Sequence, residues 1–151
     1  MSDIYNPFIP LAARTAGLGL FAVIHPLPAY LINSFIFDSL DFSIGKWLGI
    51  VPQNLSGESR TYFIFDKIGD TLLRTVALLF APKWFGLLLG LYLFRMIGEI
   101  LAIKLNKPSL LRYFPNLFEV FYIASFFDGP LAVIIIVFGI ILKMVQEWYL
   151  H

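Results

Sequence analysis

Four carboxylates occur as two closely spaced pairs in the first half of the sequence. Asp38-x-x-Asp41 is followed, after a polar interval, by Asp66-x-x-x-Asp70. Hard divalent cations prefer carboxylate oxygens, so two acidic pairs on neighbouring helices could surround one ion. The pattern predicts a Mg²⁺ or Mn²⁺ site with these ligands: Asp38, Asp41, Asp66 and Asp70. A metal held there could bridge the phosphates of a lipid or a nucleotide.

The two acid spacings resemble those of the CDP-alcohol phosphotransferases. That family carries D-x-x-D-G-x-x-A-R followed by G-x-x-x-D-x-x-x-D, and the resemblance here covers only the acidic pairs. Phe42 follows Asp41 where the family has glycine, and Tyr62 stands at the later glycine position. The resemblance implies a metal-dependent reaction on a lipid headgroup, but these departures leave the chain outside the family.

A second set of charges lies within apolar stretches and at helical spacing. Asp66, Asp70 and Arg74 are four residues apart, as are Arg95 and Glu99. An ionisable group within a membrane span costs about 2.5–3.5 kcal/mol on insertion scales, so each should have a partner. We predict one intramembrane polar cluster: Asp66, Asp70, Arg74, Arg95, Glu99, Arg112 and Glu119. Either the cluster consists only of ion pairs that fix helix register, or it lines a cavity that binds a ligand.

The composition indicates a membrane protein. Hydrophobic residues make up 59% of the 151 residues and charged residues 14%, whereas soluble domains carry about 25% charged residues. A soluble chain of this kind would need a partner covering nearly all of its surface. The net charge of +1 gives no indication of nucleic-acid binding, which would need a basic stripe. The absence of cysteine excludes disulfides and thiolate metal sites.

The apolar stretches predict an all-α protein, a bundle of five transmembrane helices in a single integral membrane domain covering residues 1–151. Each crossing needs about 20 mostly apolar residues. Turns are indicated at Pro82-Lys83-Trp84, Asn106-Lys107-Pro108-Ser109 and Asp128-Gly129-Pro130. Residues 42–61 form a loop with one amphipathic stretch. The five expected spans are residues 11–37, 62–81, 85–105, 110–127 and 131–148.

Lysine and arginine counts predict the orientation. With five spans, one side receives Lys46, Arg60, Lys104, Lys107 and Lys143, and the other receives Arg14 and Lys83. The side richer in these cations is cytoplasmic, which places the amino terminus outside and the carboxyl terminus inside. The alternative is four spans with residues 110–130 re-entrant, which would move the carboxyl terminus outside.

Two other features have a structural interpretation beside a functional one. His25, within the first span, could ligate a haem or chlorophyll axially, or it could belong to the kink made by Pro26 and Pro28. Gly86-x-x-x-Gly90, with Gly98 on roughly the same face, is typical of close helix packing.

Two classes of function follow. The first is a non-enzymatic membrane component, such as a small subunit, a transport accessory or a lipid-binding module, with a charge-lined pocket in its cytoplasmic half. The second is a divalent-metal-dependent enzyme that acts on a lipid headgroup at the cytoplasmic leaflet. The expected partners are the lipid bilayer and either a membrane protein or a second copy of the chain, with no nucleic acid.

Overall fold

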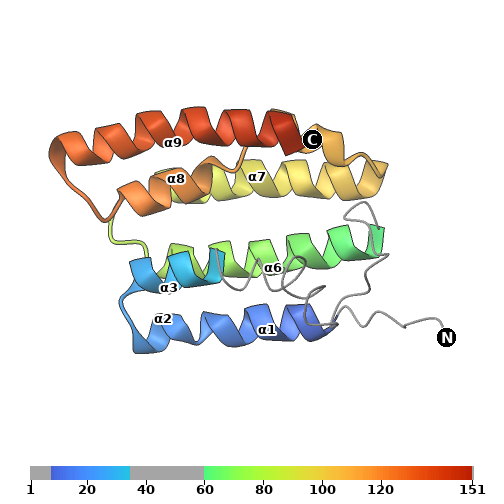
Figure 1. Ribbon diagram of the computed structural model, residues 1–151, viewed down its shortest axis with the longest axis horizontal. Coiled ribbons are helices and arrows are strands. Elements are labelled where there is room, and N and C mark those ends of the chain that lie inside the picture. The colour runs from blue at the N-terminus through green and yellow to red at the C-terminus, as the bar shows by residue number, and fades with distance from the viewer. Residues whose placement is uncertain (1–7, 35–59, 151) are drawn as a thin grey trace. The chain divides into compact units, whose positions relative to one another are not determined.

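The computed structural model describes residues 8–34 and 60–150, which form helices joined by turns. No strand occurs in these two ranges, so the all-helical prediction is confirmed for them. The chain forms two compact units, an amino-terminal unit, Met1–Val76, and a carboxyl-terminal unit, Ala77–His151. The single membrane domain stays a prediction. Figure 1 shows the helices of each unit.

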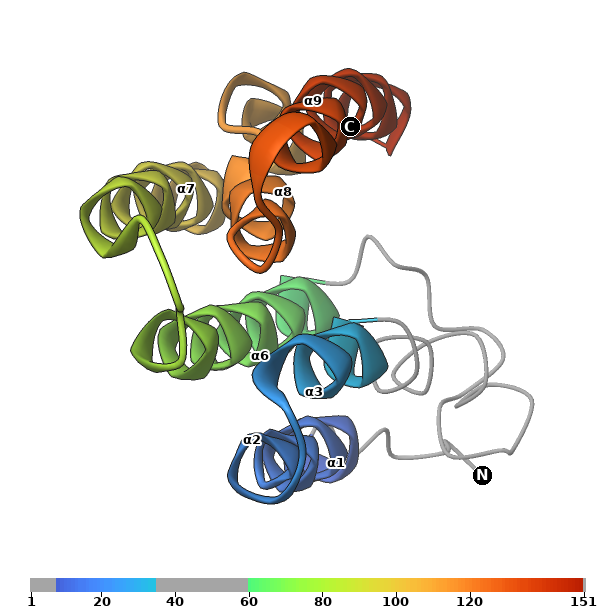
Figure 2. The same ribbon diagram turned by 90° about the vertical axis from the view of Figure 1, so that its left-hand side faces the viewer.

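The first predicted span is a helical hairpin in the amino-terminal unit. It consists of α1 (Phe8–Leu18), α2 (Leu20–Val23) and α3 (Pro26–Ile32). The side-chain amide of Asn33 donates a hydrogen bond to the carbonyl of Gly17 at 2.9 Å, although one continuous helix would separate these residues by about 24 Å. Figure 2 shows α3 lying beside α1. The prediction of a single crossing over residues 11–37 is therefore wrong.

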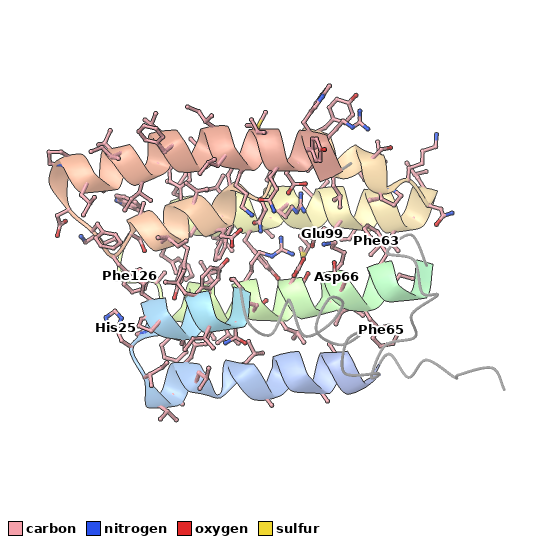
Figure 3. The ribbon with its side chains drawn as sticks, viewed as in Figure 1. His25, Phe63, Phe65, Asp66, Glu99 and Phe126 are labelled. Carbon is pink, nitrogen blue, oxygen red and sulfur yellow. The ribbon has the colours of Figure 1, made fainter. Side chains whose placement is uncertain are left out.

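Pro26 and the residue before it cause the reversal at the start of α3. A proline disfavours helical backbone in the preceding residue, and His25 accordingly has φ −55° and ψ 138°. Its Nδ1 accepts a hydrogen bond from the main-chain N–H of Leu27 at 3.3 Å, which caps α3. Figure 3 places His25 at this turn. The structural interpretation of His25 as part of a proline bend is confirmed.

The helix α6 (Arg60–Leu79) corresponds to the second predicted span. It begins two residues before the expected start at Tyr62. The charged residues of α6 lie in its first three-quarters. Helix α6 is not among the described helices that are long and apolar enough to cross a membrane. The predicted residues 35–37 of the first span, and the loop with its amphipathic stretch up to residue 59, lie outside the described residues.

The carboxyl-terminal unit contains α7 (Phe85–Leu105), a 3₁₀ helix (Pro108–Tyr113), α8 (Leu117–Ala124) and α9 (Gly129–Leu150). The short α8 packs against both long helices, as Figure 2 shows. The three predicted turns are present. Trp84 and Asn106 have left-handed backbone at the two ends of α7, and Gly129 has a φ of +59°, which suits glycine.

The fourth predicted span is broken into two short helices. Pro115 has no N–H and disfavours helical backbone in the residue before it. Phe114 accordingly has φ −126° and ψ 63°, and the α-helix begins again only at Leu117. The prediction of one continuous helix over residues 110–127 is therefore wrong.

The broken segment nevertheless carries the chain from one end of the unit to the other. Asp128, which follows it, contacts Lys83, just before α7, with 2.5 Å between Oδ1 and Nζ. Arg112, near its start, lies over the ring of Trp148 near the end of α9. The four-span alternative requires a re-entrant segment, which would begin and finish at the end of the unit where α7 finishes. Residues 108–128 instead begin at that end and finish at the opposite one.

Two helices are long and apolar enough to cross a membrane among the described residues. They are α7, over Phe85–Leu105, and α9, over Gly129–Tyr149, and they match the third and fifth predicted spans. Most large apolar side chains of α9 are exposed, among them Val137, Phe138 and Leu142. The five-span count as a whole is not established by these two helices.

Candidate functional site: buried ion pairs of the carboxyl-terminal unit

The guanidinium of Arg95 lies at the centre of a buried network near the middle of α7. Its Nε lies 3.2 Å from Oε1 of Glu99, one turn along the same helix. Its Nη1 lies 3.0 Å from Oε1 of Glu147, on α9. The three residues are only 4%, 3% and 6% exposed. A charge buried this deeply requires both a counter-charge and hydrogen bonds, and Arg95 has both.

Arg95 also donates to carbonyl groups at the helix break. Its Nη1 donates to the carbonyl oxygen of Phe114 at 2.5 Å. It donates as well, at 3.4 Å, to the carbonyl of Leu111, which already accepts a hydrogen bond from the N–H of Phe114 at 2.9 Å. An interrupted helix inside a membrane is tolerated only where its freed backbone groups find partners. The same side chain therefore ties α7 to α9 and stabilises the break before Pro115. The main-chain N–H of Asn116 adds a 3.4 Å hydrogen bond to Glu147.

A second ion pair joins α8 to α9. Nζ of Lys143 lies 2.5 Å from Oε2 of Glu119, and both side chains are mostly buried. Lys143 and Glu147 are four residues apart on α9, so this pair lies about one turn from the Arg95 contacts. We call the following residues the carboxyl-terminal ion-pair network: Arg95, Glu99, Glu119, Lys143 and Glu147.

Arg112, which the sequence assigned to the polar cluster, contacts an aromatic ring near the end of the unit. Its guanidinium carbon lies 5.2 Å from the ring centroid of Trp148, within the range of a cation–π interaction. Its Nε donates to the carbonyl of Ser109 at 3.1 Å. The contact with Trp148 joins the 3₁₀ helix to the last turns of α9, whereas the hydrogen bond to Ser109 lies within the 3₁₀ helix.

The remaining predicted cluster residues lie on α6 in the amino-terminal unit. Nζ of Lys67 lies 2.7 Å from Oδ2 of Asp66 and 2.9 Å from Oδ2 of Asp70. Nε of Arg74 donates to the main-chain carbonyl of Asp70 at 3.1 Å. The ammonium of Lys67 therefore contacts both carboxylates from within the same helix. The sequence analysis expected Arg74 as the partner of Asp70. Arg74 contacts the main-chain carbonyl of Asp70, and Lys67 contacts its carboxylate.

The predicted metal site can be located only in part. Asp38 and Asp41 lie outside the described residues, and Asp66 and Asp70 both contact Lys67. Within residues 8–34 and 60–150, no group of three or more His, Cys, Asp or Glu side chains could hold a metal ion. Mg²⁺ or Mn²⁺ bound by all four aspartates stays a prediction.

The glycines of α7 do not share one packing role. A Cβ on Gly98 would overlap the ring of Phe114, so this glycine allows α7 to approach the broken segment closely. A Cβ on Gly86 or Gly90 would meet no atom within 4 Å. The packing interpretation is therefore confirmed for Gly98, whereas Gly86 and Gly90 have no such neighbour among the described residues.

Sequence reasoning missed the contributions of Glu147 and Lys143. Both were treated as residues that end the last span, because they follow its cleanest apolar stretch. Their spacing of four residues repeats that of Arg95 and Glu99, and this signal could have placed them in the cluster.

Comparison of the chain with protein-family models, with curated proteins and with solved structures gave no significant match. The function is therefore argued from the site itself.

Proposed function

We propose that the chain is a small integral membrane protein that acts without catalysis, as a subunit, an accessory or a lipid-binding module. The observation that carries this proposal is the distribution of polarity in the carboxyl-terminal unit. Arg95, Glu99 and Glu147 are buried together, while the surface of α9 is formed by large apolar side chains. A water-soluble domain has the opposite arrangement, since exposing so much apolar surface to water is unfavourable.

The contacts support a structural role for the charges. Arg95 and Lys143 each bind a carboxylate on another helix. These pairs join α7 to α9 and α8 to α9, which fixes the positions of the helices relative to one another. In a bilayer, helix association gains little from the hydrophobic effect, so interhelical polar contacts specify the arrangement.

We infer which end of the carboxyl-terminal unit faces the cytoplasm. The carboxyl end of α7 and that of α9 lie at the same end of the unit, together with Lys104, Lys107 and Arg112. The positive-inside rule assigns this end to the cytoplasm. The carboxyl terminus is therefore expected inside, as in the sequence-based topology, and the outside position of the amino terminus stays a prediction.

Membrane extraction and reporter fusions test this proposal. The protein should stay in the membrane fraction after an alkaline carbonate wash, because α7 and α9 are held by apolar surface rather than by charge. A reporter fused at His151 should indicate cytoplasm. Release by carbonate would refute the membrane assignment. An outside signal at His151 would contradict the inferred orientation of the carboxyl-terminal unit.

The metal-dependent enzyme is the weaker candidate, because the carboxylates of Asp66 and Asp70 already share a contact with the ammonium of Lys67. The charge-lined pocket of the sequence analysis likewise stays a prediction, since the charges of the network contact one another directly.

A further inference from the structure

Cations gather at the end of the carboxyl-terminal unit where α7 finishes. Lys104 lies in the last turn of α7, Lys107 precedes the 3₁₀ helix, and Arg112 lies within it. The side chains of Lys104 and Lys107 are exposed, and that of Arg112 is partly exposed. We call these three residues the basic end.

Local backbone structure brings the basic end to the last turns of α9. Asn106 ends α7 in a left-handed conformation, and the N–H of Lys107 returns to the carbonyl of Ala102 at 2.9 Å. The chain then turns into the 3₁₀ helix, where Arg112 stacks on Trp148. Figure 1 shows the carboxyl end of α9 beside this segment.

Exposed aromatic side chains accompany the cations. Tyr113, Trp148 and Tyr149 are 65%, 67% and 91% exposed. Tryptophan and tyrosine are enriched where a membrane meets water, because one part of each ring system is apolar and another is polar. The exposed apolar side chains of Leu101, Leu105 and Val145 continue from this end along α7 and α9.

Exposed negative charge is found at the other end of the unit. Among its described residues, the only acidic side chain classed as exposed is Asp128, which contacts Lys83. Glu99 and Glu147 are buried against Arg95. The basic end therefore presents cations directly beside apolar surface, with no exposed carboxylate among the described residues there.

We propose that the basic end binds the phosphate headgroup of an anionic glycerophospholipid, whose acyl chains lie along the apolar surface of α7 and α9. An ammonium is a strong partner for phosphate, and each cation near an anionic leaflet strengthens binding by about five-fold. The apolar surface beside the cations favours a lipid over a nucleic acid or an acidic protein. This inference rests on the proposed function, which places the chain in a bilayer, and it adds to that function the class of lipid that the protein binds.

Fluorescence quenching by brominated lipids tests the lipid preference. The full chain carrying Trp47→Phe and Trp84→Phe keeps Trp148 as its only tryptophan. In phosphatidylcholine vesicles, brominated phosphatidylglycerol should quench Trp148 more strongly than brominated phosphatidylcholine at the same mole fraction. Lys104→Gln and Lys107→Gln should each reduce this preference roughly two- to five-fold. High salt should reduce it as well.

Two matched controls use the opposite end of the same unit. Lys83→Gln in the Trp148-only protein should leave the preference unchanged. A chain with Trp84 as its only tryptophan should show no preference for the anionic lipid. Circular dichroism, together with unchanged quenching by brominated phosphatidylcholine, would verify that each variant is folded and inserted.

The outcomes separate this inference from the proposed function. Equal quenching of Trp148 by both lipids would overturn the lipid preference and leave the membrane location intact. Stronger quenching of Trp84 by brominated phosphatidylglycerol would also overturn the inference, because the lipid preference would then not come from the basic end. No quenching of either tryptophan by either lipid would refute the membrane location and the lipid site together.

Discussion

The two units place their buried charges differently. In the amino-terminal unit, Lys67 contacts carboxylates one and three residues away on α6. In the carboxyl-terminal unit, Arg95 contacts Glu147, which lies 52 positions further along the sequence. Pairs within one helix neutralise charge without holding helices together. Pairs between helices add tertiary constraints, so mutations should cost more in the carboxyl-terminal unit.

Loss of Arg95 should have the largest effect. Arg95→Leu leaves Glu99 and Glu147 buried without their guanidinium and removes the donor to the carbonyl of Phe114. Breaking a buried pair in this way costs about 3–5 kcal/mol. Unfolding in detergent should show this loss of stability.

The Arg95→Leu, Glu99→Leu, Glu147→Leu triple variant serves as the control. It should be less destabilised than Arg95→Leu alone, because no carboxylate is then left unpaired in the network. Simply additive losses would show that the three residues are not energetically coupled.

Packing at the broken segment should give the next largest effect. Gly98→Ala places a methyl group against Phe114 and should cost about 1–3 kcal/mol, the usual cost of overpacking. The matched variant Gly90→Ala meets no neighbour and should change stability by about 1 kcal/mol or less. Detergent unfolding of both proteins measures the difference. Equal effects would show that the close approach at Phe114 contributes little to the unit.

Asp70→Asn in the amino-terminal unit should have a smaller effect. Lys67 keeps Asp66 as a partner, so the loss should be about 1 kcal/mol or less. Thermal melting should show this decrease, with no response of the wild-type protein to added Mg²⁺ or Mn²⁺.

The metal site predicts the reverse result for the same variant. If Asp38, Asp41, Asp66 and Asp70 share a cation, divalent ions should raise the melting temperature of the wild-type protein. Asp70→Asn should then abolish that rise and stabilise the metal-free chain, because it relieves repulsion among the carboxylates.

Lys83→Gln should have the smallest effect. Its partner Asp128 has a side chain that is 91% exposed, and pairs of this kind contribute about 0–1 kcal/mol. The melting temperature should stay close to that of the wild-type protein. A loss as large as that of Arg95→Leu would contradict the distinction between exposed and buried pairs.

Apolar periodicity and turn residues predicted the long helices accurately. The bounds of α7 match the expected third span, and the turns at Pro82, Asn106 and Gly129 follow from residue types with known backbone preferences. These features depend on local sequence, so the sequence is sufficient to predict them.

The two errors of fold both concern prolines. Pro26 was interpreted as part of a kink and Pro115 lies within the fourth expected span, yet the chain reverses at the first and the helix breaks at the second. What decides the outcome is the partner of the freed backbone. At the second break Arg95 supplies such a partner to the carbonyl of Phe114, from 19 residues away. At the first, Asn33 joins the two arms of the hairpin through the carbonyl of Gly17, 16 residues away. No local pattern indicates which distant side chain will make such a contact.

The sequence predicted which types of residue make up the candidate site, but it did not predict all of their ion-pair partners. Arg95 with Glu99 followed from helical spacing, whereas Glu147 and Lys143 required the arrangement of three helices. The contact of Lys67 with both Asp66 and Asp70 depends on side-chain geometry, which spacing does not determine.

The distance in sequence between Arg95 and Glu147 has a consequence for biosynthesis. At about 5–20 residues per second, the ribosome makes Glu147 roughly 3–10 s after Arg95. Glu99 is made almost at once and offers the guanidinium a counter-charge while α9 is still missing. The nascent chain thus carries a provisional partner for Arg95, and the arrival of the last helix completes the pairing.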